Sequence, residues 1–174
     1  MKKKINRLGI LGGTFDPPHE GHVYISKISI KKLKLNKLIW AVTKKNPLKN
    51  KPHLSTKTRI RLSKEINKKN KKILIKYFDN KIGSNTFDLL NFVKKTNKKS
   101  KLFFIIGADN LTKFYKWKKW SYIPKLAKIV VFPRGNYSFK TLKASTLKKL
   151  DKSDWILMNV KKINISSSLI RKIW

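Results

Sequence analysis

Short apolar runs alternate with amphipathic segments along the whole chain. Apolar runs and period-two patterns predict strands at residues 5–11, 37–42, 73–78, 102–106, 126–132 and 155–160. Segments with helical spacing of apolar positions predict helices at 21–33, from a cap at Ser55 to about residue 66, at 86–95 and at 166–174. Repeated alternation of strands and helices favours the α/β class, with a doubly wound parallel sheet covered on both faces.

The size of the chain limits its domain organisation. It has 174 residues, 40% of them hydrophobic, which suits one domain with a substantial core. No linker, repeat or change of composition marks a boundary, so we expect a single domain over 1–174. No segment approaches the ~20 apolar residues of a membrane helix, and the basic N-terminus leads directly into the first strand, so we expect neither a membrane partner nor a signal peptide.

Two features of the composition bear on location and partners. The chain contains no cysteine, which excludes disulfides and thiolate metal sites and fits the cytoplasm. Its formal net charge of +36 would attract nucleic acid without sequence preference. The lysines are dispersed along the chain, however, so we expect no specific nucleic-acid partner. Arginine is harder to replace in planar recognition of phosphate, and the arginines are Arg7, Arg59, Arg61, Arg134 and Arg171.

The candidate chemistry gathers where the first strand ends. The segment from Gly12 to His22 contains two glycines, two prolines and two of the three histidines. Glycine lets backbone N–H groups approach a ligand, and a helix N-terminus favours an anion. Since His19 and His22 lie on the same side of a first helical turn, we interpret the segment as a phosphate site at the carboxyl end of the strand. The alternative is a glycine–proline turn with incidental histidines; His53 is expected at the surface.

Further polar residues follow the later strands. A hydroxyl at Thr86 precedes a helix and is either a nucleotide contact or an ordinary N-cap. Asp109 leaves the fourth strand, where a plain helix cap is the alternative to a functional role. Arg134 follows the fifth strand, and either phosphate binding or structural pairing would suit it. A second candidate anion site lies at the start of the last predicted helix. It combines the hydroxyls of Ser166, Ser167 and Ser168 with Arg171 on the first turn, although a capping box alone would explain the serines.

Two stretches resemble known signatures. Gly12–His22 resembles the His-x-Gly-His signature of the nucleotidyltransferase superfamily, and Asn164–Arg171 resembles its second signature, Ile-Ser-Ser-Thr-x-x-Arg. Within this superfamily the chain is similar to the nicotinate-nucleotide adenylyltransferases over nearly its full length. The resemblance implies a Rossmann-like, three-layer α/β/α nucleotidyltransferase fold. It also implies transfer of the adenylyl group of ATP to nicotinate mononucleotide, which yields deamido-NAD and pyrophosphate in NAD biosynthesis.

The resemblance further implies a role for individual residues. Catalytic roles fall on His19, His22 and Arg171. ATP-binding roles fall on Gly12, Thr14, Phe15, Gly107, Asp109, Arg134, Ser167 and Ser168. Binding of nicotinate mononucleotide falls on Gly13, Lys45, Thr86 and Trp117, with Lys49 as a second candidate for the loop lysine. Trp117 would stack on the pyridine ring, whereas Trp120 is expected in the core.

The sequence predicts no metal site built from protein side chains, because no carboxylate cluster offers a cage. Mg²⁺ is expected to bind through the ATP phosphates and water. Another adenylyltransferase of the superfamily, with nicotinamide mononucleotide or phosphopantetheine as acceptor, is the main alternative function. A basic nucleic-acid-binding protein is a weaker one. Monomer and homodimer both remain open.

Overall fold

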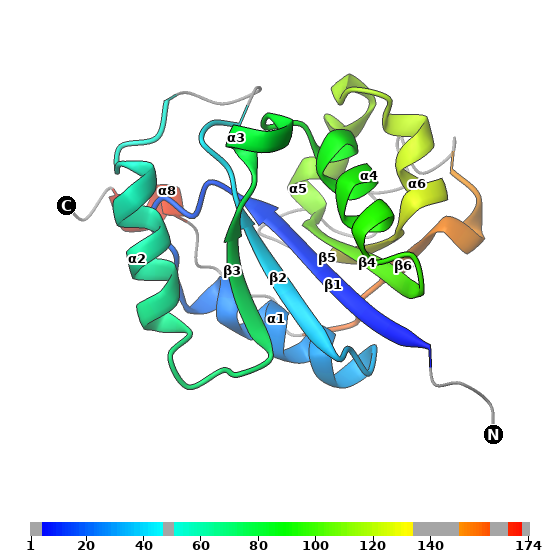
Figure 1. The fold of residues 1–174 in the computed structure, drawn as a ribbon, viewed down its shortest axis with the longest axis horizontal. Helices are drawn as coiled ribbons and strands as arrows, with labels where there is room; N and C mark the ends of the chain where they lie inside the picture. Colours follow the sequence, from blue (N-terminus) through cyan, green and yellow to red (C-terminus); the bar gives the residue numbers. More distant parts are fainter. Residues whose placement is uncertain (1–4, 47–50, 134–149, 161–166, 172–174) are drawn as a thin grey trace.

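A computed structural model describes residues 5–46, 51–133, 150–160 and 167–171, without the side chains of Ser168 and Leu169. These residues form a six-stranded sheet in the order β3-β2-β1-β4-β5-β6, and every neighbouring pair is parallel (Figure 1). The strands are β1 (Asn6–Gly13), β2 (Lys37–Val42), β3 (Ile73–Tyr77), β4 (Ser100–Gly107), β5 (Lys128–Phe132) and β6 (Trp155–Leu157).

Helices connect the strands. The α-helices are α1 (Glu20–Lys32), α2 (Thr56–Ile66), α3 (Asp79–Ile82), α4 (Thr86–Thr96), α5 (Ala108–Leu111), α6 (Ile123–Leu126) and α8 (Ser167–Arg171). The 3₁₀ helices are η1 (Phe114–Lys116), η2 (Trp120–Tyr122) and η4 (Lys152–Asp154). None of the helices in the described ranges is both long and apolar enough to cross a membrane.

The sheet separates two apolar clusters, so the molecule has three layers. On one face, Leu90 and Val93 of α4 pack with Ile10 of β1 and Phe104 of β4. On the other face, Val23 of α1 packs with strand residues that point the opposite way, among them Leu11, Leu38, Trp40 and Ile105. Adjacent residues of one strand enter different clusters because side chains alternate across a sheet. The predicted α/β class and doubly wound parallel sheet are confirmed.

Several predicted boundaries were wrong, each for a local reason. β1 continues through both glycines to Gly13, because Gly12 and Gly13 pair with Ala41 and Val42 of β2. β5 begins at Lys128, since Leu126 closes the short helix α6. β6 ends at Leu157, where its ladder with β5 ends, and the N–H of Met158 makes a further bond to the carbonyl of Val131 at 2.9 Å. The sequence also missed the short helices between β4 and β5, which are too brief to show a period.

The strand order creates a crevice at the centre of the sheet. From β1 the chain proceeds to β2 and β3 on one side, and then returns to β4 and β5 on the other. Connections that leave β1 and β4 in opposite directions open a crevice at the carboxyl ends of these strands, where open α/β sheets bind ligands. Gly13 ends β1 and Gly107 ends β4, so both lie at this position.

Candidate active site

A cavity lies at the carboxyl ends of β1 and β4. Its lining includes Gly12, Gly13, His19 and His22 from the first signature, and Gly107 from the end of β4. A Cβ at Gly12 would come no closer than 3.8 Å to another side chain, and one at Gly13 no closer than 3.5 Å. These are ordinary contacts, so the fold itself does not require glycine at either position. Their missing side chains instead leave room in the cavity.

The two histidines form the N-terminal cap of α1. His19 is the N-cap residue, and its Nδ1 accepts a hydrogen bond from the backbone N–H of Gly21 at 3.1 Å. His22 Nδ1 accepts from the backbone N–H of His19 at 3.3 Å. An Nδ1 that accepts a hydrogen bond cannot carry a proton, so each neutral ring holds its proton on Nε2. The cap therefore fixes both tautomers and makes each Nε2 a donor. The ring centroids lie 3.8 Å apart.

The ring of Phe15 packs against His22. Its side chain is buried and stacks on Trp40, with centroids 4.7 Å apart and planes 7° apart. It also lies 4.9 Å from the His22 ring. Trp40 Nε1 donates to Ser26 Oγ at 2.8 Å, and Ser26 Oγ donates to the carbonyl of His22 at 2.7 Å. Because its ring is buried in this stack, Phe15 can meet a ligand through its backbone only.

The second signature meets the first. Figure 1 shows α8 near the carboxyl end of β1, although the two elements are far apart in the sequence. Ser167 Oγ donates to the carbonyl of Pro17 at 2.8 Å. The Arg171 guanidinium donates to the carbonyl of Asp16 and lies 3.6 Å from its carboxylate. The structure thus brings Arg171 and Ser167 onto the histidine loop, while Ser166 and the side chain of Ser168 are outside what it describes.

The opposite side of the cavity comes from α4 and the segment after β4. Thr86 is the first residue of α4 and lines the cavity, and the N-cap is Asn85 rather than Thr86. Trp117 also lines the cavity and packs against Phe104 and Phe114, with centroids 6.1 and 5.1 Å away. The N-terminus of α4 and the indole ring therefore share one compartment. Trp120 packs on the core, as predicted.

The remaining predicted residues lie at the margin or outside the described structure. Asp109 is in the first turn of α5, whose N-cap is Gly107, and the cavity lining includes Asn110 in its place. Lys45 is exposed after β2, and its neighbour Asn46 lines the cavity. Thr14 is half-buried on the β1–α1 loop. His53 is exposed, in agreement with its prediction. Lys49 and Arg134 lie outside the described residues.

Sequence reasoning missed Arg59, a buried residue of α2. Its guanidinium donates to the carbonyls of Thr14 at 2.5 Å, Thr43 at 2.7 Å and Lys44 at 3.1 Å. Burial lowers the pKa of Arg59, and the negative charge of Asp16 opposes this shift. An arginine on the apolar side of an amphipathic helix, in a chain whose basic residues are mostly lysine, is the signal that could have revealed it.

Two further residues that sequence reasoning missed, Asp79 and Lys118, line the cavity. Asp79, at the start of α3, accepts from the backbone N–H of Lys44 at 2.7 Å and from the hydroxyl of Ser84. Lys118 lines the cavity and forms an ion pair with Asp88 of α4 at 2.9 Å. Asp79 could have been singled out because the chain has only eight acidic residues. The lysine had no distinguishing signal among so many.

Comparison with known proteins places this geometry in context. The cytidylyltransferase-like family model matches residues 10–173. A curated relative from Pelagibacter ubique (strain HTCC1062), described as "Probable nicotinate-nucleotide adenylyltransferase", is 47% identical over 99% of this chain and 96% of its own length. A relative of the same description from Ruegeria sp. (strain TM1040) is 32% identical over 95% of this chain and 96% of its own length.

The fold also matches a solved structure. The nicotinic acid mononucleotide adenylyltransferase of Plasmodium falciparum, complexed with NaAD, superposes with a TM-score of 0.78. The match covers 96% of this chain and 83% of the other, at 23% sequence identity. This similarity supports the three-layer nucleotidyltransferase-like fold.

Proposed function

The chain belongs to the cytidylyltransferase-like family, and from this membership we propose that it transfers the adenylyl group of ATP to nicotinate mononucleotide. The products are deamido-NAD and pyrophosphate, a step of NAD biosynthesis. The observation that carries this proposal is the 47% identity to the Pelagibacter relative over 99% of the chain. The meeting of the two signatures at Asp16 and Pro17 supports the same reaction, because it gathers phosphate-binding side chains at one crevice.

ATP lies across the carboxyl edge of the sheet in this proposal. Its triphosphate sits between the β1–α1 loop and the start of α8. His19 and His22 donate from Nε2 to the α- and β-phosphate oxygens, in the tautomers that the helix cap imposes. Arg171 neutralises the outer phosphates, with Ser167 and Ser168 at the helix start. Gly12 and the backbone of Phe15 approach the phosphates, Gly107 and Asp109 face the ribose, and Arg134 is a further ATP-binding candidate.

The acceptor occupies the compartment between α4 and Trp117. The hydroxyl of Thr86 and the N–H groups of the first turn of α4 suit the nicotinate carboxylate. Trp117 offers a flat ring for the electron-poor pyridine. Gly13 and Lys45 contact the acceptor phosphate, which Thr14 helps to orient.

The transfer is an in-line displacement. A phosphate oxygen of nicotinate mononucleotide attacks the α-phosphorus of ATP, and the bond from that phosphorus to the bridging oxygen breaks as pyrophosphate leaves. No side chain is modified. Positioning and neutralisation of charge on the transferring group therefore account for the acceleration.

Mg²⁺ is expected to accompany ATP. Within the described ranges, no group of three or more histidine, aspartate or glutamate side chains is placed to hold a metal. This does not fit a dedicated protein cage. It is compatible with an ion that keeps its water and binds through substrate phosphates.

We further propose that residues 1–174 work as one nucleotidyltransferase domain in the cytoplasm. The proposal rests on the family match over residues 10–173 and on the absence of cysteine from the sequence.

Pyrophosphate release with ATP and each acceptor in turn tests the proposed function. We expect product with nicotinate mononucleotide, and much less with nicotinamide mononucleotide because the start of α4 would lose its carboxylate partner. Equal rates with both would contradict the acid preference. Release with phosphopantetheine alone would overturn the proposal.

A further inference from the structure

We propose that Arg59 is a positioning residue of the reaction, because its buried guanidinium orients peptide planes of the β1–α1 loop, which faces the triphosphate, and of the loop after β2, which carries Lys45. The inference rests on the function proposed above and assigns a role to a residue outside the signatures. Arg59 lies on α2, with 1% of its surface exposed, and would not touch either substrate. Its effect would pass through the backbone.

One side chain gathers carbonyl groups from three segments. Nη1 donates to the carbonyls of Thr14, on the β1–α1 loop, and Thr43, after β2. Nη2 donates to the carbonyl of Lys44, and Nε donates to that of Leu54 at 3.1 Å. A guanidinium can do this because its donors form a rigid planar fork.

Holding a carbonyl fixes the amide on the other side of the same peptide plane. In a trans peptide the C=O and N–H point in opposite directions. The carbonyl of Thr14 points to Arg59, so the N–H of Phe15 points away from α2. The peptide after Thr43 is held at both ends, since its carbonyl meets Arg59 and the N–H of Lys44 meets Asp79. Arg59 therefore sets the direction of backbone donors in both loops.

Asp16 completes the connection in the reverse direction. Its carboxylate, on the β1–α1 loop, accepts from the backbone N–H groups of His53 at 2.8 Å and Leu54 at 2.9 Å. Thus α2 binds the loop through Arg59, while the loop binds the entry to α2 through Asp16. The carbonyl of Asp16 also receives Arg171. A shift at Arg59 would consequently reach both the histidine loop and the second signature.

Loss of the fork should disturb catalysis more than stability. A lysine keeps the positive charge but lacks the planar fork that holds the four carbonyls. One backbone link between the two segments would remain, because Thr43 N–H still bonds the carbonyl of Gly13 at 2.9 Å. Their amides, however, would lose the fixed direction needed at the transition state.

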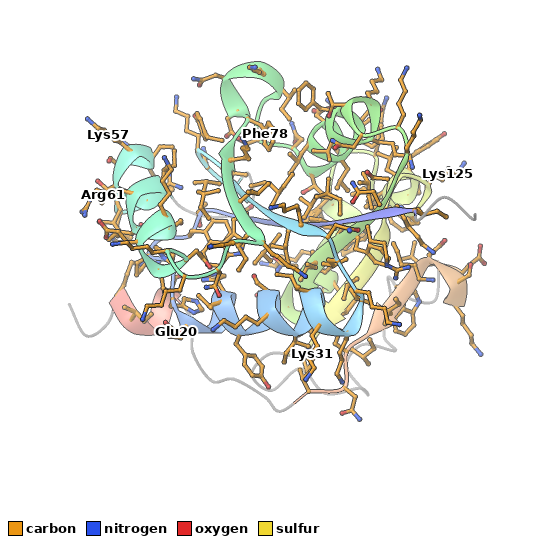
Figure 2. The ribbon with its side chains drawn as sticks, turned by 60° about the horizontal axis from the view of Figure 1, so that its bottom comes forward. Glu20, Lys31, Lys57, Arg61, Phe78 and Lys125 are labelled. Atoms are coloured by element: carbon orange, nitrogen blue, oxygen red, sulfur yellow. The ribbon has the colours of Figure 1, made fainter. Side chains whose placement is uncertain are left out.

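The test compares variants of one helix. Arg59→Lys removes the fork. Arg61→Lys makes the same change on the outer side of α2, where Arg61 pairs with Glu65 and points away from the sheet (Figure 2). Ile66→Ala lowers stability from the far end of α2, where the partly buried side chain packs against the core. Thr56→Val is a milder second variant, because it removes only the contact of Thr56 Oγ1 with Arg59 Nη2 at 2.9 Å.

We expect kcat for pyrophosphate release to fall about 10- to 100-fold in Arg59→Lys, since a displacement of roughly 1 Å can cost about that much. KM for nicotinate mononucleotide should change far less than kcat. At temperatures well below their unfolding midpoints, Arg61→Lys and Ile66→Ala should keep the kcat of the wild type. The kcat of Thr56→Val should lie between those of the wild type and Arg59→Lys. Amide hydrogen exchange at 14–16 and 43–45 should accelerate in Arg59→Lys alone.

The outcomes separate this role from a structural one. A kcat for Arg59→Lys equal to that of the wild type, or a matching loss in Ile66→Ala, would overturn the positioning role. If Arg59→Lys does not fold, an unchanged kcat in Thr56→Val overturns it equally. A wild type that releases pyrophosphate only with another acceptor refutes the proposed function. The role of Arg59 is then decided by the same kcat ratios with that acceptor and by the exchange rates.

Discussion

Replacement of His22 separates its two contributions, which are donation to phosphate and capping of α1. His22→Ala removes both the Nε2 donor and the Nδ1 acceptor of the His19 N–H. His22→Asn removes only the first, because the Asn Oδ1 is attached to Cγ as Nδ1 is, and can accept the same N–H. Both variants should lose adenylyl transfer, but only the alanine should lose stability.

The expected magnitudes follow from these two contacts. Loss of one donor to charge that develops in the transition state costs about 2.7–4 kcal/mol, which corresponds to a fall in kcat of about 10²- to 10³-fold. Loss of a cap costs about 0.5–2 kcal/mol. For a chain of this size, each kcal/mol lowers the melting temperature by about 2–4 °C.

Two measurements test the reasoning. Pyrophosphate release with ATP and nicotinate mononucleotide reports kcat, and thermal denaturation followed by circular dichroism reports the melting temperature. His53→Ala is the matched control, because His53 is exposed and lies outside the cavity lining. Near-normal turnover in His22→Asn would refute the role of the Nε2 donor. A melting temperature equally low in both variants would refute the cap argument.

Three further substitutions test other parts of the site. Gly13→Ala should fold normally, because the added Cβ meets only an ordinary contact of 3.5 Å, yet it should raise KM for nicotinate mononucleotide by filling the cavity; unchanged steady-state kinetics would contradict this. Trp117→Leu should raise KM for nicotinate mononucleotide roughly 2- to 10-fold without affecting KM for ATP, since a ring stack is worth about 0.5–1.5 kcal/mol. An equal effect on both KM values would argue against stacking. Asp16→Asn should lower the free energy of unfolding by about 1.5–3 kcal/mol, because the amide can accept only one of the two N–H groups. Urea denaturation measures this loss, and a clearly smaller value would contradict the argument.

Much of the fold was predictable because it depends on local periodicity. The range predicted for β2 matches the structure, and Ser55 caps α2 as expected, accepting from the N–H of Thr58. Apolar residues recur with the period of a strand or helix whichever partners bury them. The errors at β5 and in the 108–126 segment arise where elements are too short to show a period.

The candidate site was predictable in part for a different reason. The signatures mark His19, His22 and Arg171 because phosphate transfer needs donors and positive charge in a fixed local spacing. They do not show which loops lie opposite them. Thr86 was assigned to the acceptor side from its resemblance, and the structure adds that it shares a cavity with Trp117.

The sequence by itself determined the alternation of strands and helices and the two signature stretches. The tertiary structure decided how distant segments meet. It placed Arg171 on Asp16, 155 residues away, and turned Arg59 toward four carbonyl groups. The physical reason is that periodicity records whether a side chain is buried, whereas its hydrogen-bond partners depend on strand order and on the path of each loop. The apolar side of α2 can therefore indicate that Arg59 is buried, but not which carbonyls its guanidinium binds.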